Sequence, residues 1–329
     1  MSVGIGIIGL PESGRTTVFN ALTKGNAATG MQAPKAPHIG ISKVPDARLN
    51  KLAEMFKPKK IVPAEIKYLD IGASIKGIGK DSSISGELLT QLSNVDALIN
   101  VVRSFSDESV AHPSGTIDPS RDIDNMNMEL SFSDLTIMER RMERIANSLK
   151  SAKADERQQY KNEQDLLAKI KTDLENDIPI REQNLTEEEE KLITGYQFLS
   201  AKPLLTIVNI GESQLADTGK TEQEMNDKFG TATHHVIAFC GNLEMELAQL
   251  DDEESAASFR SDFGLTEPGL DRVIKQSYAL LGLISFLTAG ADECRAWPIT
   301  DGTVAQKAAG KIHSDIERGF IRAETISFD

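Results

Sequence analysis

Cysteine and long apolar runs are scarce in this 329-residue chain, and each scarcity excludes a class of protein. Two cysteines, Cys240 and Cys294, cannot build a disulfide framework or a metal cluster, so we expect both to be small buried residues. The longest apolar stretch, residues 279–289, is too short for a membrane helix and contains glycine and serine. No basic segment precedes the first apolar run, so we expect no secretory signal, no membrane partner and a cytoplasmic location.

Positive charge is also in short supply. Lysine and arginine number 36 against 50 aspartates and glutamates, which gives a formal net charge of −14. A general DNA-binding protein needs a basic surface, so this function class is excluded. The best basic patch is Lys57-Pro58-Lys59-Lys60, and we favour the interpretation that it is a solvated turn between a helix and a strand.

The most informative motif is a glycine loop near the start of the chain, Gly9-Leu10-Pro11-Glu12-Ser13-Gly14-Arg15-Thr16-Thr17. In the phosphate-binding pattern G-x-x-x-x-G-K-[ST], backbone N–H groups surround phosphate oxygens, the lysine reaches the β- and γ-phosphates, and the hydroxyl binds Mg²⁺. The chain matches every fixed position except the lysine, which is Arg15. The motif therefore predicts a nucleotide site with one altered cation.

The neighbours of this loop support a P-loop. Residues 3–8 form a short apolar run of the kind found in buried parallel strands, and Val18, Phe19 and Leu22 have helical spacing. A strand, a glycine loop and a helix together direct a helix N-terminus at an anion. The alternative is an ordinary glycine-rich turn, and we favour the P-loop over it.

The rest of the chain predicts an α/β protein with an insertion. Five apolar runs alternate with helical or loop segments and indicate parallel strands with helical crossovers: 3–8, 66–71, 97–102, 204–210 and 235–239. Between the third and fourth runs, a stripe with coiled-coil spacing predicts an antiparallel helical insertion: Leu135, Met138, Met142, Ile145 and Leu149. The final segment indicates strands and turns at 286–290, 295–299 and 319–323 around a helix near 304–312, a small α+β module that does not finish.

Two further segments fit a nucleotide site. Asp70 ends an apolar run and is placed to approach Mg²⁺, but Ala73 stands where the D-x-x-G signature of GTPases has its glycine. After the run at 204–208, Asn209-Ile210-Gly211-Glu212 stands where the guanine-reading N-K-x-D signature is expected. Loss of the lysine and of the aspartate indicates relaxed or adenine preference. The alternative is a polar turn after a strand.

Together these residues closely resemble the YchF/Obg-like ATPases, P-loop proteins of the translation-factor GTPase superfamily, over nearly the whole chain. The matching segments beyond the P-loop are Val44-Pro45-Asp46 with Arg48-Leu49, residues 56–64, Val101-Val102-Arg103, Asp118-Pro119 with Arg121-Asp122-Ile123, Asn209-x-x-Glu212, residues 250–253, and Thr288-Ala289-Gly290 with Arg295-Ala296-Trp297. Their sum is far more specific than any single motif.

The resemblance implies a Ras-like P-loop NTPase domain in two parts (1–125 and 203–283), an antiparallel coiled-coil insertion (126–202) and a truncated TGS-like module (284–329). It implies ATP and Mg²⁺ as ligands and the ribosome or a translation-related complex as partner. The implied nucleotide-binding residues are Gly9, Glu12, Ser13, Gly14, Arg15, Thr16, Thr17, Asn209, Ile210 and Glu212. Thr16 would bind Mg²⁺, and Asp70 would approach it through water.

Three departures from the family pattern fall on nucleotide chemistry. They are Arg15, Ala73, and the segment 30–37, where Pro34 lies near the expected Mg²⁺-binding threonine. No catalytic residue is predicted. Two hypotheses follow: a slow ATPase that acts as a switch and prefers ATP to GTP, or a degenerate pseudo-NTPase that serves as a binding scaffold with weak or no hydrolysis. A GTPase is disfavoured by Gly211-Glu212.

Overall fold

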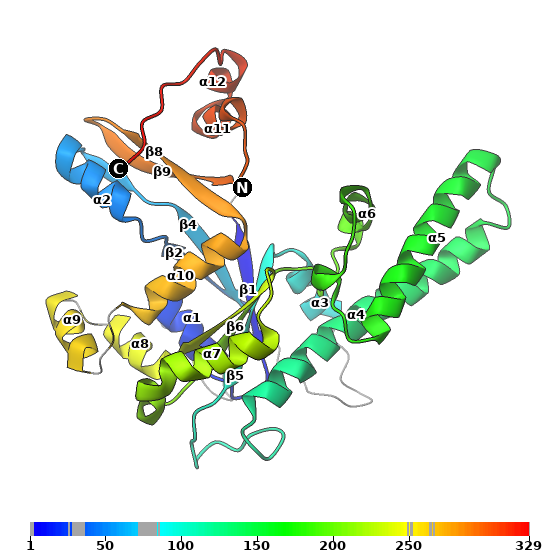
Figure 1. The fold of residues 1–329 in the computed structure, drawn as a ribbon, viewed down its shortest axis with the longest axis horizontal. Coiled ribbons are helices and arrows are strands. Elements are labelled where there is room, and N and C mark those ends of the chain that lie inside the picture. The colour runs from blue at the N-terminus through cyan, green and yellow to red at the C-terminus, as the bar shows by residue number, and fades with distance from the viewer. Residues whose placement is uncertain are drawn as a thin grey trace.

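The structure is a computed structural model that describes residues 3–25, 27, 37–71, 84, 86–248, 250, 253–262, 265 and 267–328. Its centre is a six-stranded sheet in the order β2-β4-β1-β5-β6-β7 (Figure 1). The strands are β1 (Gly4–Gly9), β2 (His38–Lys43), β4 (Glu65–Asp70), β5 (Ala97–Arg103), β6 (Leu204–Asn209) and β7 (His234–Phe239). All neighbouring pairs are parallel except β2 with β4. The five predicted strands are confirmed to within one residue at each end.

Helices cover both faces of this sheet, because alternate residues of each strand point to opposite sides. Ile7 of β1 joins one apolar cluster with α1 (Arg15–Thr23) and α10 (Gly269–Leu280). The next residue, Ile8, joins a second cluster with α3 (Gly86–Ser93) and α4 (Pro119–Ser148). Three further helices follow in this part of the chain: α7 (Thr218–Phe229), which packs on β7, α8 (Gly241–Ala248), which packs on α1, and α9 (Glu253–Asp262). This doubly wound arrangement confirms the predicted α/β class.

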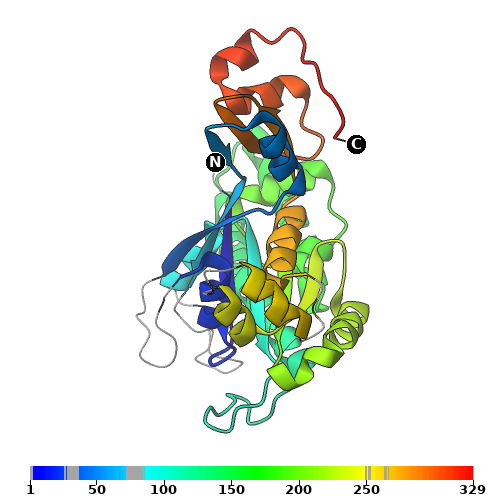
Figure 2. The same ribbon diagram turned by 90° about the vertical axis from the view of Figure 1, so that its left-hand side faces the viewer.

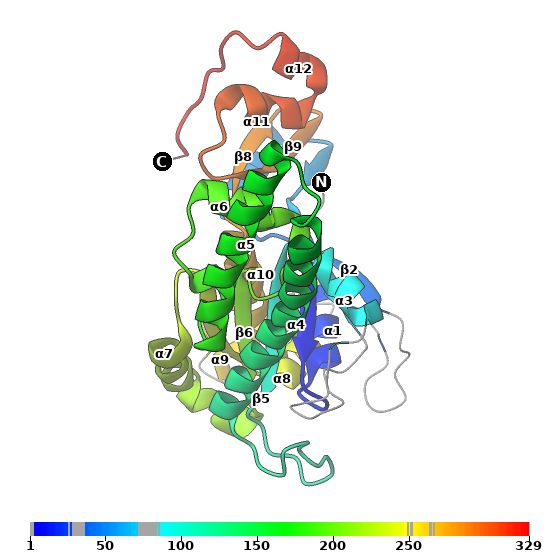
Figure 3. The same ribbon diagram turned by 90° about the vertical axis from the view of Figure 1, so that its right-hand side faces the viewer.

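The predicted helical segment forms a pair of long helices that extends from the body, visible in Figures 1 and 3. The first is α4, and the second is α5 (Ala154–Glu175), followed by the short α6 (Glu187–Ile193). Their shared core contains Met138, Ile145, Leu167 and Ile170. Across the pair, Arg141 Nε lies 2.7 Å from Glu163 Oε1. The finer prediction, coiled-coil packing, remains a prediction. Two short 3₁₀ helices, Ile180–Glu182 and Thr194–Tyr196, also lie in this segment, and another, Glu212–Asp217, follows β6.

The C-terminal part contains a second sheet, in the order β3-β9-β8. β8 (Leu283–Ala289) and β9 (Glu293–Thr300) form an antiparallel pair, and β3 (Lys60–Val62), which follows α2 (Ala47–Phe56), lies parallel to β9. Figure 2 shows this early segment beside the C-terminal strands.

Two short helices, α11 (Ala305–Ile312) and α12 (Ser314–Arg318), follow the second sheet. Within the described residues, no strand forms at 319–323, where the sequence suggested a strand or turn, and Ile321 there is 91% exposed. With no partner strand in the described chain, this stretch has nothing on which to pair its backbone groups. Nor does any helix in the described part of the chain have the length and apolar character of a membrane span.

Candidate nucleotide site

The glycine loop between β1 and α1 has the backbone that phosphate binding needs. Glu12 and Gly14 both adopt positive φ angles, 60° and 85°. Ser13 N donates to Leu10 O at 3.3 Å, and Val18 N donates to Gly14 O at 3.0 Å as α1 begins. Left-handed residues alternating with ordinary ones direct successive N–H groups to one side, and the helix N-terminus adds its partial positive charge. The loop can therefore hold an anion.

Two positions in this loop have no room for a side chain and therefore require glycine. A Cβ on Gly9 would lie 2.6 Å from the Val101 carbonyl oxygen of the neighbouring strand β5. A Cβ on Gly14 would overlap Asn209 Nδ2, well inside the 3.0 Å that real Cβ contacts keep. The loop is therefore packed closely on its surroundings, and Gly14 is needed for both its φ angle and its lack of a side chain.

Asn209, the last residue of β6, ties three segments together. Its side chain is 4% exposed. Its Nδ2 donates to Ser13 O at 3.0 Å, and its Oδ1 accepts from Gly241 N at 2.9 Å. These bonds join the ends of β1, β6 and β7 at the carboxyl edge of the sheet, where open α/β sheets bind ligands. The sequence identified Asn209 as a base-facing residue, and the structure shows it holding the phosphate loop.

Asp70, the predicted metal-site carboxylate, is almost completely buried and is engaged through both oxygens. Arg15 Nε lies 2.8 Å from Asp70 Oδ1, with side-chain exposures of 15% and 1%. Thr16 Oγ1 donates to Asp70 Oδ2 at 2.8 Å. Mg²⁺ prefers hard oxygen ligands about 2.1 Å away, so adjacent ligands in an octahedron lie about 3 Å apart. The hydroxyl and the carboxylate are the kind of ligand that Mg²⁺ prefers, but the Arg15 guanidinium already pairs with one of the two carboxylate oxygens.

The predicted base-facing residues differ in exposure. Ile210 is 2% exposed, and its N–H donates to Phe239 O at 3.0 Å. Glu212 is exposed at the start of the 3₁₀ helix, and Thr17 lies half-buried in the first turn of α1. The predictions at Ala73 and Pro34 concern residues outside those that the structure describes.

Phe105 is a site neighbour that sequence reasoning missed. It follows β5, and its ring edge lies 3.7 Å from the Cβ position of Gly14. Its own Cβ lies 3.4 Å from the Cβ position of Gly211. The Arg103 guanidinium lies over this ring, with Cζ 4.6 Å from the ring centroid. An aromatic residue thus stands between the phosphate loop and the segment that follows β6.

Comparisons with known proteins agree with this geometry. The "Ribosome-binding ATPase YchF" of Bacillus subtilis (strain 168) is 38% identical over 333 residues, which span 100% of this chain and 90% of the relative. The protein of the same name from Escherichia coli O157:H7 is 39% identical with the same coverage. The chain belongs to the YchF family.

Two further matches concern the C-terminal residues and the three-dimensional fold. A family model named YchF-GTPase_C, described as "Protein of unknown function (DUF933)", matches residues 283–329. The solved structure of the Schizosaccharomyces pombe YchF GTPase superposes with a TM-score of 0.82 at 31% identity, covering 97% of this chain and 86% of that one. The fold of this YchF-family chain is therefore that of a YchF GTPase.

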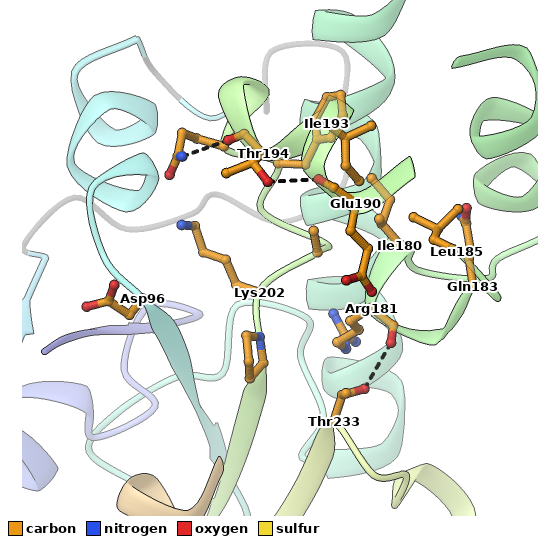
Figure 4. Close-up of a pocket in the computed structure, with 14 residues that line it drawn as sticks. Asp96, Ile180, Arg181, Gln183, Leu185, Glu190, Ile193, Thr194, Lys202 and Thr233 are labelled. Carbon is orange, nitrogen blue, oxygen red and sulfur yellow. Dashed lines mark hydrogen bonds between the residues drawn. The ribbon is translucent and has the colours of Figure 1, made fainter. Parts of the chain in front are cut away.

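A cavity of about 390 Å³ lies at the other end of the central sheet (Figure 4). Its lining includes Asp96, Pro203 and Thr233, which directly precede β5, β6 and β7. Arg181 and Lys202 also line it, and burial lowers the pKa of both, that of Arg181 to about 10.

Those two cations already have protein partners. The Arg181 guanidinium, 1% exposed, donates to Asn127 Oδ1 at 2.8 Å, and Lys202 Nζ donates to Ser93 O at 3.1 Å. The cavity therefore lies where the helical segment packs against the sheet of this YchF-family protein. The candidate nucleotide site lies at the opposite edge of the sheet, where β1, β6 and β7 end.

Proposed function

We propose that this chain binds ATP with Mg²⁺ in preference to GTP, hydrolyses it slowly as a conformational switch, and associates with the ribosome. The observation that carries the proposal is the Asn209 link, which joins the phosphate loop to the segment after β6 that would read the base. The names of the bacterial relatives, each a "Ribosome-binding ATPase", support both the nucleotide and the partner.

The base preference follows from the residues after β6. In the guanine-reading signature, an aspartate accepts from the amino and imino groups of guanine, and here the lysine and aspartate are replaced by Gly211 and Glu212. The exposed Glu212 carboxylate is an acceptor that suits the exocyclic amino group of adenine. Phe105 offers an aromatic face beside the same segment. Together these residues favour adenine without the contacts that select guanine.

Hydrolysis at such a site depends on positioning and charge stabilisation. The backbone N–H groups from Glu12 to Thr16 would hold the β- and γ-phosphates in a fixed orientation, aided by the N-terminus of α1. Mg²⁺ carried by the nucleotide would neutralise developing negative charge on the phosphates. Within the described residues we assign no side chain to proton transfer, which agrees with slow turnover.

A scaffold without turnover is the second candidate, and one contact favours it. Arg15, which replaces the P-loop lysine, pairs with Asp70 in this structure, whereas phosphate-directed catalysis needs a cation on the nucleotide. Under this alternative the protein keeps the fold, binds nucleotide weakly, and acts through its helix pair and C-terminal module.

Calorimetric titration with non-hydrolysable ATP and GTP analogues, each with Mg²⁺, tests the proposal. We expect micromolar ATP-analogue binding and weaker GTP-analogue binding, followed by slow phosphate release from ATP in a single-turnover assay. Binding without release would establish the scaffold, and GTP preference would contradict the base assignment. Co-sedimentation with purified ribosomes, with and without the ATP analogue, tests the partner. Absence from the ribosomal pellet in both states would contradict that part.

A further inference from the structure

Arg15 stands at the position where a P-loop has lysine, and its side chain contacts the carboxylate of Asp70. Lysine carries a point charge at the end of a flexible stem, whereas arginine carries a planar fork whose Nε–H lies one atom back from its tip. In this chain Arg15 Nε faces Asp70 Oδ1 at 2.8 Å. An ammonium has no donor at that position of the side chain. The contact is an ion pair that lacks the alignment of a hydrogen bond, and a lysine at residue 15 could pair with Asp70 only through its terminal ammonium.

Asp70 has no unengaged oxygen in this arrangement. Thr16 Oγ1 occupies Oδ2 at 2.8 Å, and Arg15 occupies Oδ1, while the carboxylate is 1% exposed. Arg15 and Thr16 are also the first two residues of α1, so the carboxylate joins the end of β4 to the start of the helix behind the phosphate loop. A divalent cation at Thr16 and Asp70 would approach a site that already holds a guanidinium charge.

We propose that the Arg15 guanidinium replaces the divalent cation as the charge partner of Asp70, so that nucleotide binding by this chain depends little on Mg²⁺. The inference rests on the proposed nucleotide function and specifies its metal requirement. Arg15 supplies a fixed positive charge beside the phosphate loop that needs no ion from solution. The same charge repels a divalent ion at Thr16, and the bond to Asp70 competes with that ion for the carboxylate.

The test compares nucleotide affinity with and without the metal in Arg15→Lys and in the unaltered protein. Dissociation constants for a non-hydrolysable ATP analogue are measured with excess Mg²⁺ and with EDTA. We expect the two values to differ by less than about threefold in the unaltered protein and by more than about tenfold in Arg15→Lys, where an ammonium cannot keep the Nε contact. Circular dichroism of each nucleotide-free protein checks that it is folded.

Arg48→Lys is the matched control. Arg48 also contacts a carboxylate through Nε, 3.0 Å from Asp46 Oδ1, but it lies on α2, away from the phosphate loop. We expect its Mg²⁺ dependence to equal that of the unaltered protein. A change as large as that in Arg15→Lys would overturn the assignment of the effect to the Arg15–Asp70 pair.

A second measurement uses only the unaltered protein. Mn²⁺ is titrated into the complex of protein and ATP analogue and followed by electron paramagnetic resonance. We expect Mn²⁺ to bind the complex no more tightly than it binds the free nucleotide. Tighter Mn²⁺ binding, or a Mg²⁺ dependence as strong as that of Arg15→Lys, would overturn the inference while leaving the proposed function intact. Absence of nucleotide binding in both Mg²⁺ and EDTA would overturn the two together.

Discussion

Alanine at residue 14 should both destabilise the protein and abolish its nucleotide affinity. Gly14 has φ 85°, and a Cβ there would overlap Asn209 Nδ2. Asn209 cannot simply rotate away, because its amide is bonded to Ser13 O at 3.0 Å and to Gly241 N at 2.9 Å. One added methyl group therefore strains the backbone and breaks the link between the three loops.

The magnitude can be estimated from these parts. A left-handed alanine costs about 1–2 kcal/mol. Losing two buried hydrogen bonds costs about 1 kcal/mol each. Alanine also lowers the entropy of the unfolded chain, which returns about 0.4–1 kcal/mol. The net loss of unfolding free energy is therefore about 2–4 kcal/mol. Because the loop that binds phosphate is the part displaced, we expect the affinity for an ATP analogue to fall below detection.

Urea denaturation and calorimetric titration measure the two effects. Gly219→Ala provides the matched control, because Gly219 lies in α7 and a Cβ there meets nothing within 4 Å. Alanine is favoured over glycine by about 1 kcal/mol in a helix interior and by less in the first turn, where Gly219 lies, so the control should lose no stability and keep its nucleotide affinity. If Gly14→Ala is as stable as the unaltered protein, the reasoning about Asn209 is refuted.

Three further predictions concern two residues near the candidate site, Phe105 and Asn209, and one on α4, Asp134, which accepts from Leu199 N and Ser200 N. Phe105→Ala should weaken ATP-analogue binding about tenfold, because an aromatic face beside a base is worth about 1–3 kcal/mol, while inorganic phosphate binding, measured in parallel, should not change. Asn209→Asp should lower the unfolding free energy by about 2–4 kcal/mol in urea, since a carboxylate cannot donate to Ser13 O and would be buried beside it. Burial raises the pKa of Asp134 to about 6, so the folded protein binds its proton more tightly than the unfolded chain does. This group's contribution to stability is therefore present below about pH 4 and is lost as pH rises to about 6, an effect of about 3 kcal/mol. The difference in unfolding free energy between the unaltered protein and Asp134→Asn should fall across that range, and a constant difference would contradict the assignment.

Much of the fold could be predicted because its strands are continuous apolar runs. Five strands were found this way. β1, β5 and β6 are buried along their whole length and β7 nearly so, whereas β4 is buried on one face only. β2 was missed because it is an antiparallel edge strand with exposed Ile39 and Ile41, and its pattern does not stand out. β3 was missed for a different reason. Its three residues pair with β9, more than 200 positions later, and nothing local indicates that contact.

Some residues of the candidate site could likewise be predicted from the sequence, and others could not. The phosphate loop follows a spacing rule, so Gly9, Gly14 and Thr16 could be named from the sequence alone. The contacts of Asn209 depend on how the ends of β1, β6 and β7 meet, which a motif does not specify. Phe105 belongs to no motif at all, and only the fold brings it beside Gly14. The Arg15–Asp70 pair likewise needs the register of β4 beside β1, in which Ile7 faces Asp70.

These contacts bear on how the loop would bind a nucleotide. A glycine-rich loop normally loses entropy when a ligand orders it, and that loss weakens binding. Here Asn209 fixes the loop from one side by donating a hydrogen bond to Ser13 O. Asp70 fixes the start of α1 from the other side through its contacts with Arg15 and Thr16. The N–H groups are then positioned before the phosphate arrives, which favours affinity. The same bonds resist movement of Asp70, and a nucleotide switch needs such movement to signal the state of its γ-phosphate. A site built this way should therefore bind better than it switches, which is the physical basis for expecting slow turnover.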